Sequence, residues 1–259
     1  MRLLPPRSSS TLGSPSRTAS RGLRVVGIVA LSLLVAACEW VPVRTFDETS
    51  QPAFTFHHLT RDGADGYLTS ASKGHLKVSA ATTNTGTNTR TLIVPAGQPL
   101  STEQQSCATW EAQTGVNTQQ GLALRVRHDD AEGRWRAVTV TKNVMWGANW
   151  QFNVLTWDSR QTGWQMHGSV NLAPVFWPDQ QLAPLPWRIC ARVEGDLVRV
   201  KGWRVGQPEP SWDDPGHSGS VRLPAGWIYP STAGWYVGHL APGGSTTMSG
   251  LVLDRLELR

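Results

Sequence analysis

The sequence predicts an all-β fold of two antiparallel sheets packed face to face. After residue 45 the chain consists of short runs of alternating apolar and polar side chains, separated by Gly, Pro, Asn and Asp. Such alternation is typical of strands with one buried face, and almost no helical periodicity interrupts it. About a dozen short strands at this spacing are characteristic of a two-sheet sandwich.

Two hairpins are the clearest elements of this pattern. In the first, Gly121–Val126 returns as Trp135–Thr141 after a polar turn, and its apolar face carries Leu122, Leu124 and Val126. In the second, Arg188–Glu194 turns at Gly195-Asp196 and returns as Leu197–Val205. Further strands are expected at Phe54–His58, His75–Val78, Thr91–Val94, Cys107–Glu111, Trp150–Trp157, Trp164–Val170, Val221–Leu223, Trp235–His239 and Leu251–Leu258.

The first 37 residues are expected to form a cleaved signal peptide. Five arginines and no acidic residue precede Val25–Ala37, an apolar run of 13 residues. This run covers about 20 Å as a helix, which is too short for the roughly 30 Å core of a bilayer. The motif Val35-Ala36-Ala37-Cys38 resembles a bacterial lipobox, although an ordinary secretory cleavage site also favours small residues.

The lipobox resemblance implies a lipid-anchored protein on the extracytoplasmic side of the cell membrane. Cys38 would be acylated, residues 38–45 would form a short tether, and residues 46–259 would form the folded domain. The leader also holds five of the 24 basic residues, which leaves 19 to balance 19 acidic residues in the mature chain. The basic isoelectric point therefore belongs to the leader, and we expect no nucleic-acid partner because that would need a concentrated basic face.

Two cysteines remain after Cys38, and we expect them to pair. Cys107 and Cys190 lie outside the cytoplasm on the signal-peptide interpretation, where unpaired thiols oxidise. A bond between them would contribute about 4.5 kcal/mol on the chain-entropy model. Two buried, unpaired cysteines are the alternative.

The segment from Cys107 to the C-terminus resembles a concanavalin A-like lectin/glucanase jelly roll of the laminin-G-like kind. Four motifs carry the resemblance: Gly121-Leu-Ala-Leu-Arg-Val, Glu194-Gly-Asp-Leu leading to Trp203, Gly234-Trp-Tyr-Val-Gly-His, and Leu251-Val-Leu-Asp-Arg-Leu-Glu-Leu. The resemblance implies a jelly-roll sandwich, with Phe46–Val94 supplying its first strands. Because one fold hosts many functions, it names no ligand.

Tryptophan enrichment favours carbohydrate binding. All 13 tryptophans follow Cys38, and an indole offers a flat apolar platform for a sugar ring together with one N–H donor. In Trp150–Trp157 the alternation places Trp157 on a half-polar face with Gln151 and Asn153. Packing in the core is the alternative for each of these indoles.

The second hairpin predicts another ligand surface. Its strands place Arg192, Arg199, Lys201 and Trp203 on one face, away from the apolar positions. Such a surface is suited to an acidic or polyhydroxyl glycan. An ordinary solvated face is the alternative.

Signals for metals and catalysis are weaker. The lectin resemblance implies a structural calcium between terminal strands, which nominates Asp47 and Asp254. The Glu-x-Asp-x-(x)-Glu string of the laminarinase branch is absent from the sequence, as is a Gly-x-Ser-x-Gly elbow. We therefore expect a lectin-like, non-catalytic domain that binds a polysaccharide of the envelope or the host. The alternatives are a glycan hydrolase or lyase with a divergent site, and a protein-binding envelope component.

Overall fold

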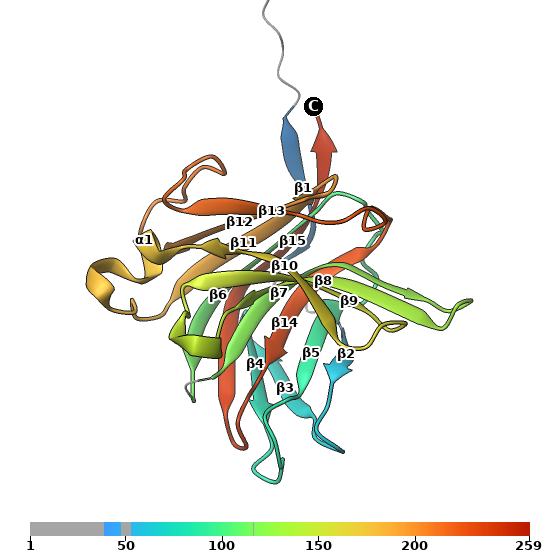
Figure 1. Cartoon of the computed structure of the whole chain (residues 1–259), viewed down its shortest axis with the longest axis vertical. Coiled ribbons are helices and arrows are strands. Elements are labelled where there is room, and N and C mark those ends of the chain that lie inside the picture. The colour runs from blue at the N-terminus through green and yellow to red at the C-terminus, as the bar shows by residue number, and fades with distance from the viewer. Residues whose placement is uncertain (1–38, 48–52, 116) are drawn as a thin grey trace, which may run out of the picture. The chain divides into compact units, whose positions relative to one another are not determined.

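Two antiparallel sheets make up the domain in the computed structural model, which describes residues 39–47, 53–115 and 117–259 (Figure 1). The predicted signal peptide and Cys38 lie outside the described residues. Among the described residues, helical structure is confined to the single turns η2 (Met145–Gly147), α1 (Ala173–Phe176) and η3 (Pro178–Gln180). In the described part of the chain, no helix is long and apolar enough to cross a bilayer.

The first sheet has eight strands. Seven follow the order β13-β12-β11-β6-β15-β4-β3, and β1 pairs with β15 beside this path. Their bounds are β13 (Ser218–Arg222), β12 (Leu197–Arg204), β11 (Trp187–Glu194), β6 (Gln104–Gln113), β15 (Ser245–Leu258), β4 (His75–Ala80), β3 (Tyr67–Ser72) and β1 (Trp40–Asp47).

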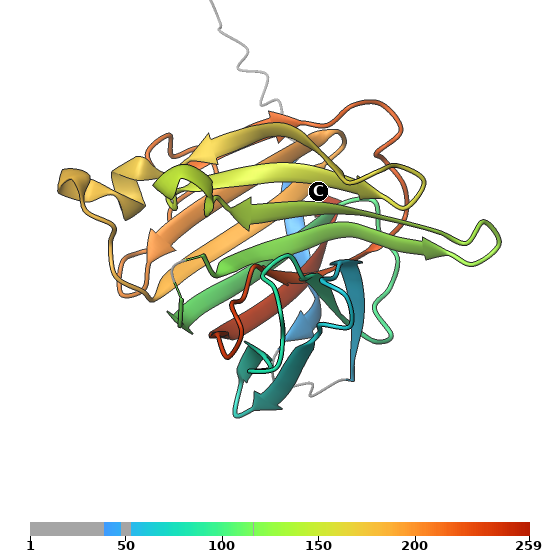
Figure 2. The ribbon, with the colours of Figure 1, turned by 60° about the horizontal axis from the view of Figure 1, so that its bottom comes forward.

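The second sheet has seven strands in the order β10-β9-β8-β7-β14-β5-β2. Figure 2 shows the hairpin of β7 and β8 extending beyond the other strands at one side. The strands are β10 (Trp164–Asn171), β9 (Gln151–Asp158), β8 (Arg134–Lys142), β7 (Gln119–Asp129), β14 (Thr232–Gly238), β5 (Arg90–Pro95) and β2 (Phe54–Thr60).

The main core lies between the two sheets. Alternating strand residues fill it from both sides, as the period of two dictates. Its centre is aromatic: the Phe176 ring stacks on Trp187 with centroids 4.2 Å apart, and Trp110 lies 5.7 Å from Phe152. These observations confirm the predicted all-β jelly-roll sandwich.

A disulfide joins Cys107 and Cys190, as predicted. The two residues are register partners on the neighbouring strands β6 and β11, and their Cα atoms are 4.1 Å apart. Both side chains point away from the main core. They pack against Trp203, Trp212 and Val252 in a separate cluster. The bond therefore lies on the outer face of the eight-stranded sheet.

The expected tether is wrong in part, because Trp40–Thr45 belongs to β1. This strand pairs with the last residues of β15, from Trp40 opposite Leu258 to Asp47 opposite Val252. The folded domain thus begins before residue 46. Its partner strand lies more than 200 positions away in the sequence, so local patterning gave no sign of the pairing.

The expected face of Val126 is also wrong. A register irregularity lies between Leu124 and Arg127, and Arg125 has a φ of +50°. An extra residue in one strand reverses the faces of the residues that follow it. Val126 consequently joins an apolar cluster on the outer face with Leu92 and Tyr236, whereas Arg125 is fully buried.

Candidate functional site

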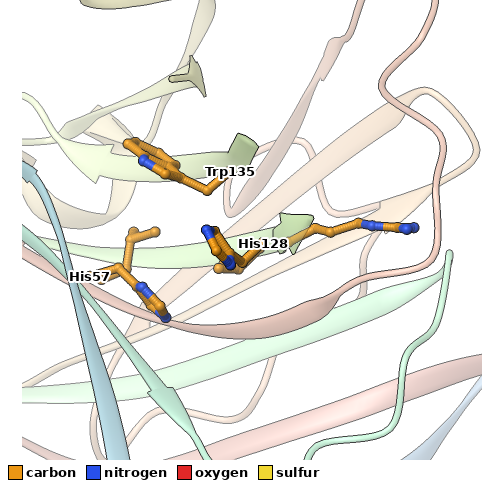
Figure 3. Close-up of a pocket in the computed structure, with 6 residues that line it drawn as sticks. His57, His128 and Trp135 are labelled. Atoms are coloured by element: carbon orange, nitrogen blue, oxygen red, sulfur yellow. The ribbon is translucent and has the colours of Figure 1, made fainter. Parts of the chain in front are cut away.

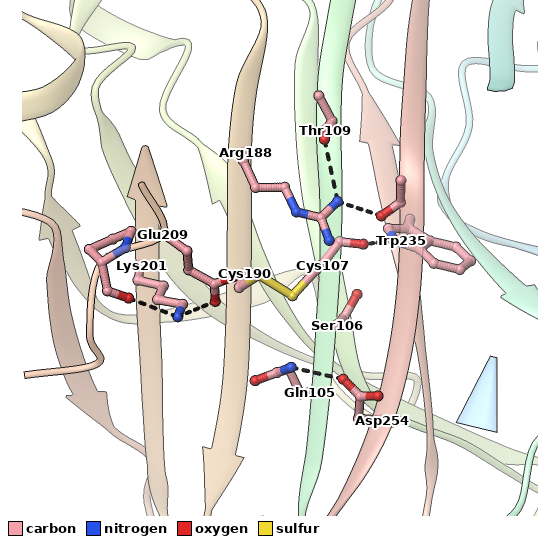
Figure 4. Close-up of a disulfide and its surroundings, with 12 residues drawn as sticks. Gln105, Ser106, Cys107, Thr109, Arg188, Cys190, Lys201, Glu209, Trp235 and Asp254 are labelled. Carbon is pink, nitrogen blue, oxygen red and sulfur yellow. Dashed lines mark hydrogen bonds and ion pairs between the residues drawn. A yellow bond between two sulfur atoms is a disulfide. The ribbon is translucent and has the colours of Figure 1, made fainter. Parts of the chain in front are cut away.

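The outer face of the eight-stranded sheet carries the predicted basic residues together. Arg192 lies opposite Arg199 in the register of β11 and β12, and Cys190 lies opposite Lys201. Figure 4 shows Lys201 close to the disulfide on this face. The alternation in the second hairpin therefore placed these side chains correctly.

The loop of residues 205–217 covers this basic face. Its Trp212 ring lies 4.2 Å from the Arg192 guanidinium carbon and 4.6 Å from the Lys201 ammonium nitrogen. Trp203 is 7% exposed and packs against the disulfide. An indole face attracts cations. Trp212 of the loop therefore occupies the positions over Arg192 and Lys201 that a ligand would need.

Carboxylates of the same chain also pair with these cations. Glu209 lies 2.6 Å from Lys201, Asp213 lies 2.6 Å from Arg199, and Glu194 lies 2.5 Å from Arg192. Lys201 is only 4% exposed. The geometry therefore gives no support to the predicted glycan surface at Arg192, Arg199, Lys201 and Trp203, because this chain already occupies it.

The predicted platform at Trp157 is buried. It lies on the outer face of the seven-stranded sheet with Gln151 and Asn153, but only 2% of it is exposed. Its indole N–H donates to Thr139 Oγ1 at 3.0 Å, and the Arg90 guanidinium lies 6.0 Å from its ring. A sugar ring cannot stack on this indole in the observed arrangement. Gln151 and Asn153, six and four positions from Trp157 along β9, are half-buried.

A small, open recess lies elsewhere on the same sheet, with a volume of about 10 Å³ (Figure 3). Its apolar lining comes from Leu92 and Val126. The rest of the lining comes from His57, Arg127, His128 and Trp135. An apolar lining with a few polar groups is the composition of small-molecule sites, although fully formed ones have volumes of about 300 Å³ or more.

Four strands, β2, β5, β7 and β8, bring these residues together. His128 on β7 lies opposite Trp135 on β8, close to the turn of their hairpin. His57 comes from the edge strand β2. In Figure 3 the His128 ring lies between Trp135 and His57. The reversed face at Val126 completes the lining, and the strand pattern did not predict this reversal.

Trp135 contributes a half-buried indole to the recess. Its backbone is held to the end of β9, because its N–H donates to Ser159 Oγ at 3.1 Å and its carbonyl accepts from the Ser159 N–H at 3.1 Å. These two hydrogen bonds fix the backbone position from which the Trp135 indole projects. The aromatic enrichment indicated such a platform, but alternation alone assigned it to Trp157.

The electrostatics of the recess are set by its basic side chains. Burial lowers the pKa of His57, and the neighbouring His128 lowers it further. His128 Nδ1 lies 2.7 Å from Asp130 Oδ1, on a carboxylate that is 95% exposed. Arg127 donates from Nη1 to the Pro230 carbonyl at 3.2 Å and keeps 36% of its side chain exposed. Arg127 lies opposite Arg136, whereas His128 lies opposite Trp135, so the guanidinium is on the other face of β7. The groups that can bond to a ligand in the recess are therefore the two imidazoles.

The nominated calcium pair does not form a site. Asp254 is 3% exposed, and its two oxygens accept from Arg44 Nε at 2.7 Å and from Gln105 Nε2 at 2.8 Å. Asp47 lies opposite Val252, two positions from Asp254 along β15. The Arg44 guanidinium takes the position beside Asp254 that a calcium ion would occupy. Asp47 and Asp254 therefore do not fit a calcium site. The described residues contain no cluster of three or more His, Cys, Asp or Glu suited to a metal.

No family model matches the sequence, and no curated protein sequence matches it. Solved structures do share the fold. The CBM2 module of the evolved Dit of Lactobacillus casei BL23 phage J-1 superposes with a TM-score of 0.50 at 11% identity, over 85% of this chain and 99% of that one. A Bacillus subtilis protein of unknown function with a galectin-like fold gives 0.50 at 10% identity, over 86% and 98%. The carbohydrate-binding module CBM66 from Bacillus subtilis gives 0.46 at 6% identity, over 77% and 94%.

Proposed function

We propose that the domain binds carbohydrate in the recess formed by His57, Arg127, His128 and Trp135. The observation that carries the proposal is the half-buried Trp135 indole beside two imidazoles and an apolar lining. The apolar face of a sugar ring packs on the indole, and its hydroxyls form hydrogen bonds with the imidazole nitrogens. The fold supports this assignment, since it is shared with a CBM2 module and a galectin-like protein.

The proposal is for binding without cleavage of the ligand. Glycoside hydrolysis generally requires two carboxyl groups on either side of the scissile bond, within about 10 Å of each other. The six described residues that line the recess include no carboxylate. A hydrolase would therefore have to recruit both groups from outside this lining.

Anchoring to the cell membrane through an acylated Cys38 forms part of the same proposal. Glu39 and Arg259 exchange backbone hydrogen bonds of 2.9 and 3.0 Å, so the chain is held to the folded domain from the residue after Cys38. A lipid at that position would hold the domain close to the bilayer surface. Replacement of Cys38 by Ser in the full chain removes the protein from the membrane fraction; retention there would contradict the anchor.

The binding proposal is tested with Trp135→Ala and a polysaccharide panel. Titration followed by tryptophan fluorescence and calorimetry measures affinity, and chromatography of the ligand afterwards shows whether it stays intact. Trp164→Ala is the matched control, since Trp164 is 47% exposed and lies outside the lining. We expect saturable binding that Trp135→Ala weakens at least tenfold and the control leaves unchanged. Equal affinity in both variants would place the ligand elsewhere.

A further inference from the structure

A stacked pair of indoles lies at the end of β8 that is remote from the recess. Trp150 directly precedes β9, Trp177 directly follows α1, and their ring centroids are 4.1 Å apart. Both side chains are half-buried, and Trp150 packs against the main core. Figures 1 and 2 show α1 and the hairpin of β7 and β8 on opposite sides of the domain. The indole pair is therefore separate from the recess.

Buried neighbours hold this indole pair in place. The Leu172 N–H donates to the Trp150 carbonyl at 3.0 Å, which joins the start of α1 to the start of β9. Phe176, the residue before Trp177, is fully buried and stacks on Trp187 with ring centroids 4.2 Å apart. A ligand that packs on Trp177 therefore meets a preformed surface, and binding to such a surface costs less conformational entropy.

A turn with an unusual backbone follows Trp177. Asp179 and Gln180 have φ values of +53° and +60°, and the Gln181 N–H closes the turn by donating to the Pro178 carbonyl at 3.0 Å. Glycine is the usual residue at such left-handed positions, because a side chain crowds the backbone there. Both side chains are nevertheless present and exposed. Backbone strain of this kind is concentrated at functional sites, where the strained residue contacts a ligand.

The two segments that carry the indoles are almost uncharged. Residues 143–150 and 172–187 include one charged side chain, that of Asp179. Amide side chains outside the core accompany it, namely those of Asn149, Gln180 and Gln181. A carboxylate accepts hydrogen bonds from hydroxyls, and an amide both donates and accepts. These segments therefore suit a neutral, hydroxyl-rich ligand, because neither segment supplies a cation for an acidic one.

We propose that Trp177, Asp179 and Gln180 form a second carbohydrate contact, which takes a neutral sugar unit of a polysaccharide. The apolar face of the sugar ring packs on the Trp177 indole, and its hydroxyls bond to the Asp179 carboxylate and the Gln180 amide. A surface platform of this kind needs no enclosed cavity. The inference rests on the ligand class of the proposed function and adds a second site, on the side of the domain away from the recess.

Neutral hexaoses of glucose, mannose and galactose test the second contact. Each is titrated by calorimetry against Trp135→Ala, in which the recess is impaired, and against the double variant Trp135→Ala, Asp179→Asn. Asparagine keeps the shape of the side chain and tolerates the left-handed backbone. We expect residual binding in the single variant, and Asp179→Asn should weaken it about tenfold because a charge-assisted hydrogen bond is lost. Asp213→Asn, at a carboxylate that is 87% exposed, is the matched control and should leave the residual binding unchanged.

The outcomes separate this inference from the proposed function. Residual binding that is absent, or that is equal with and without Asp179→Asn, would overturn the second contact. Failure of the parent to bind any glycan of the panel would overturn the proposed function itself. A loss caused by Asp179→Asn but not by Trp135→Ala would support the second contact and overturn the assignment of the recess.

Gln180→Gly gives a readout that a structural role would not produce. Glycine relieves the left-handed backbone, so this variant should melt at a temperature at least as high as that of the parent. Its affinity for the hexaose should nevertheless fall. Trp177→Ala should also weaken binding, whereas Trp164→Ala, at an indole that is 47% exposed, should not. Unchanged affinity in both Gln180→Gly and Trp177→Ala would overturn the inference.

Discussion

The Lys201 ammonium nitrogen lies 4.6 Å from the centroid of the Trp212 ring and 5.4 Å from that of Trp203. The same nitrogen donates to Glu209 and to the Pro210 carbonyl, at 2.6 and 3.0 Å. A lysine with this set of contacts is a structural cation. It attaches the loop of residues 205–217 to the sheet and covers the disulfide behind it.

Trp212→Ala should lower the free energy of unfolding by about 2–3 kcal/mol, because it removes a half-buried indole and its contacts with three cations. Urea denaturation followed by circular dichroism measures the change. Trp164→Ala, at an exposed indole, should change it by less than about 0.5 kcal/mol. Equal effects of the two variants would show that the loop contributes no stability.

Loss of the disulfide should destabilise the domain by about 2–5 kcal/mol, since the bond closes a segment with a sequence separation of 83. The double variant Cys107→Ser, Cys190→Ser is compared with the parent by urea denaturation, with and without reductant. Reductant should destabilise the parent alone. A parent that is insensitive to reductant under denaturing conditions would contradict the bond.

Lys142 should make stability depend on pH. Burial lowers its pKa from 10.5 to about 7, and its ammonium nitrogen lies 2.6 Å from Gln113 Oε1. Between these two pKa values the unfolded chain binds more protons than the folded one. The free energy of unfolding therefore rises with pH across this window, by at most about 1.4 kcal/mol per pH unit from this group.

Lys142→Met removes the titrating group, so the rise between pH 7 and pH 10 should be smaller in the variant than in the parent. Denaturant titrations at several pH values measure it. Lys77→Met, at an exposed lysine of β4, is the control and should keep the profile of the parent. A variant profile that coincides with the parent's would show that Lys142 is not the group responsible.

Arg125→Met should cost about 3 kcal/mol or more. The buried guanidinium donates to the carbonyls of Trp227, Thr102 and Gly195, which come from three separate loops. Removing it leaves buried acceptors without a donor. Thermal and urea unfolding measure the loss, and Arg222→Met at an exposed position should be nearly neutral. A small effect at both positions would mean that the carbonyls find other donors.

The strand pattern predicted most of the fold because one face of each strand is buried. The hairpin of β11 and β12 follows the alternation throughout, and its register places Arg192, Arg199 and Lys201 on one face as expected. The pattern failed where the strand itself is irregular. At Arg125 a local change of register reverses the face of Val126, and that reversal supplies part of the recess lining.

The candidate site was less predictable than the fold. Alternation nominated Trp157 as a platform, but that indole is buried, whereas the half-buried indole at the recess is that of Trp135. That difference depends on Thr139 and Arg90, which approach Trp157 from other strands. The imidazoles of His57 and His128 are 71 positions apart in the sequence, so nothing local indicated that they share a recess.

The sequence by itself determined the all-β class, the two clear hairpins and the pairing of Cys107 with Cys190. These features follow from the alternation within single strands and from the number of cysteines, both of which can be read from the sequence alone. Only the tertiary structure decided which surfaces stay open. It placed Trp212 over the basic face and brought His57 beside His128, because coverage and proximity depend on contacts between segments distant along the chain.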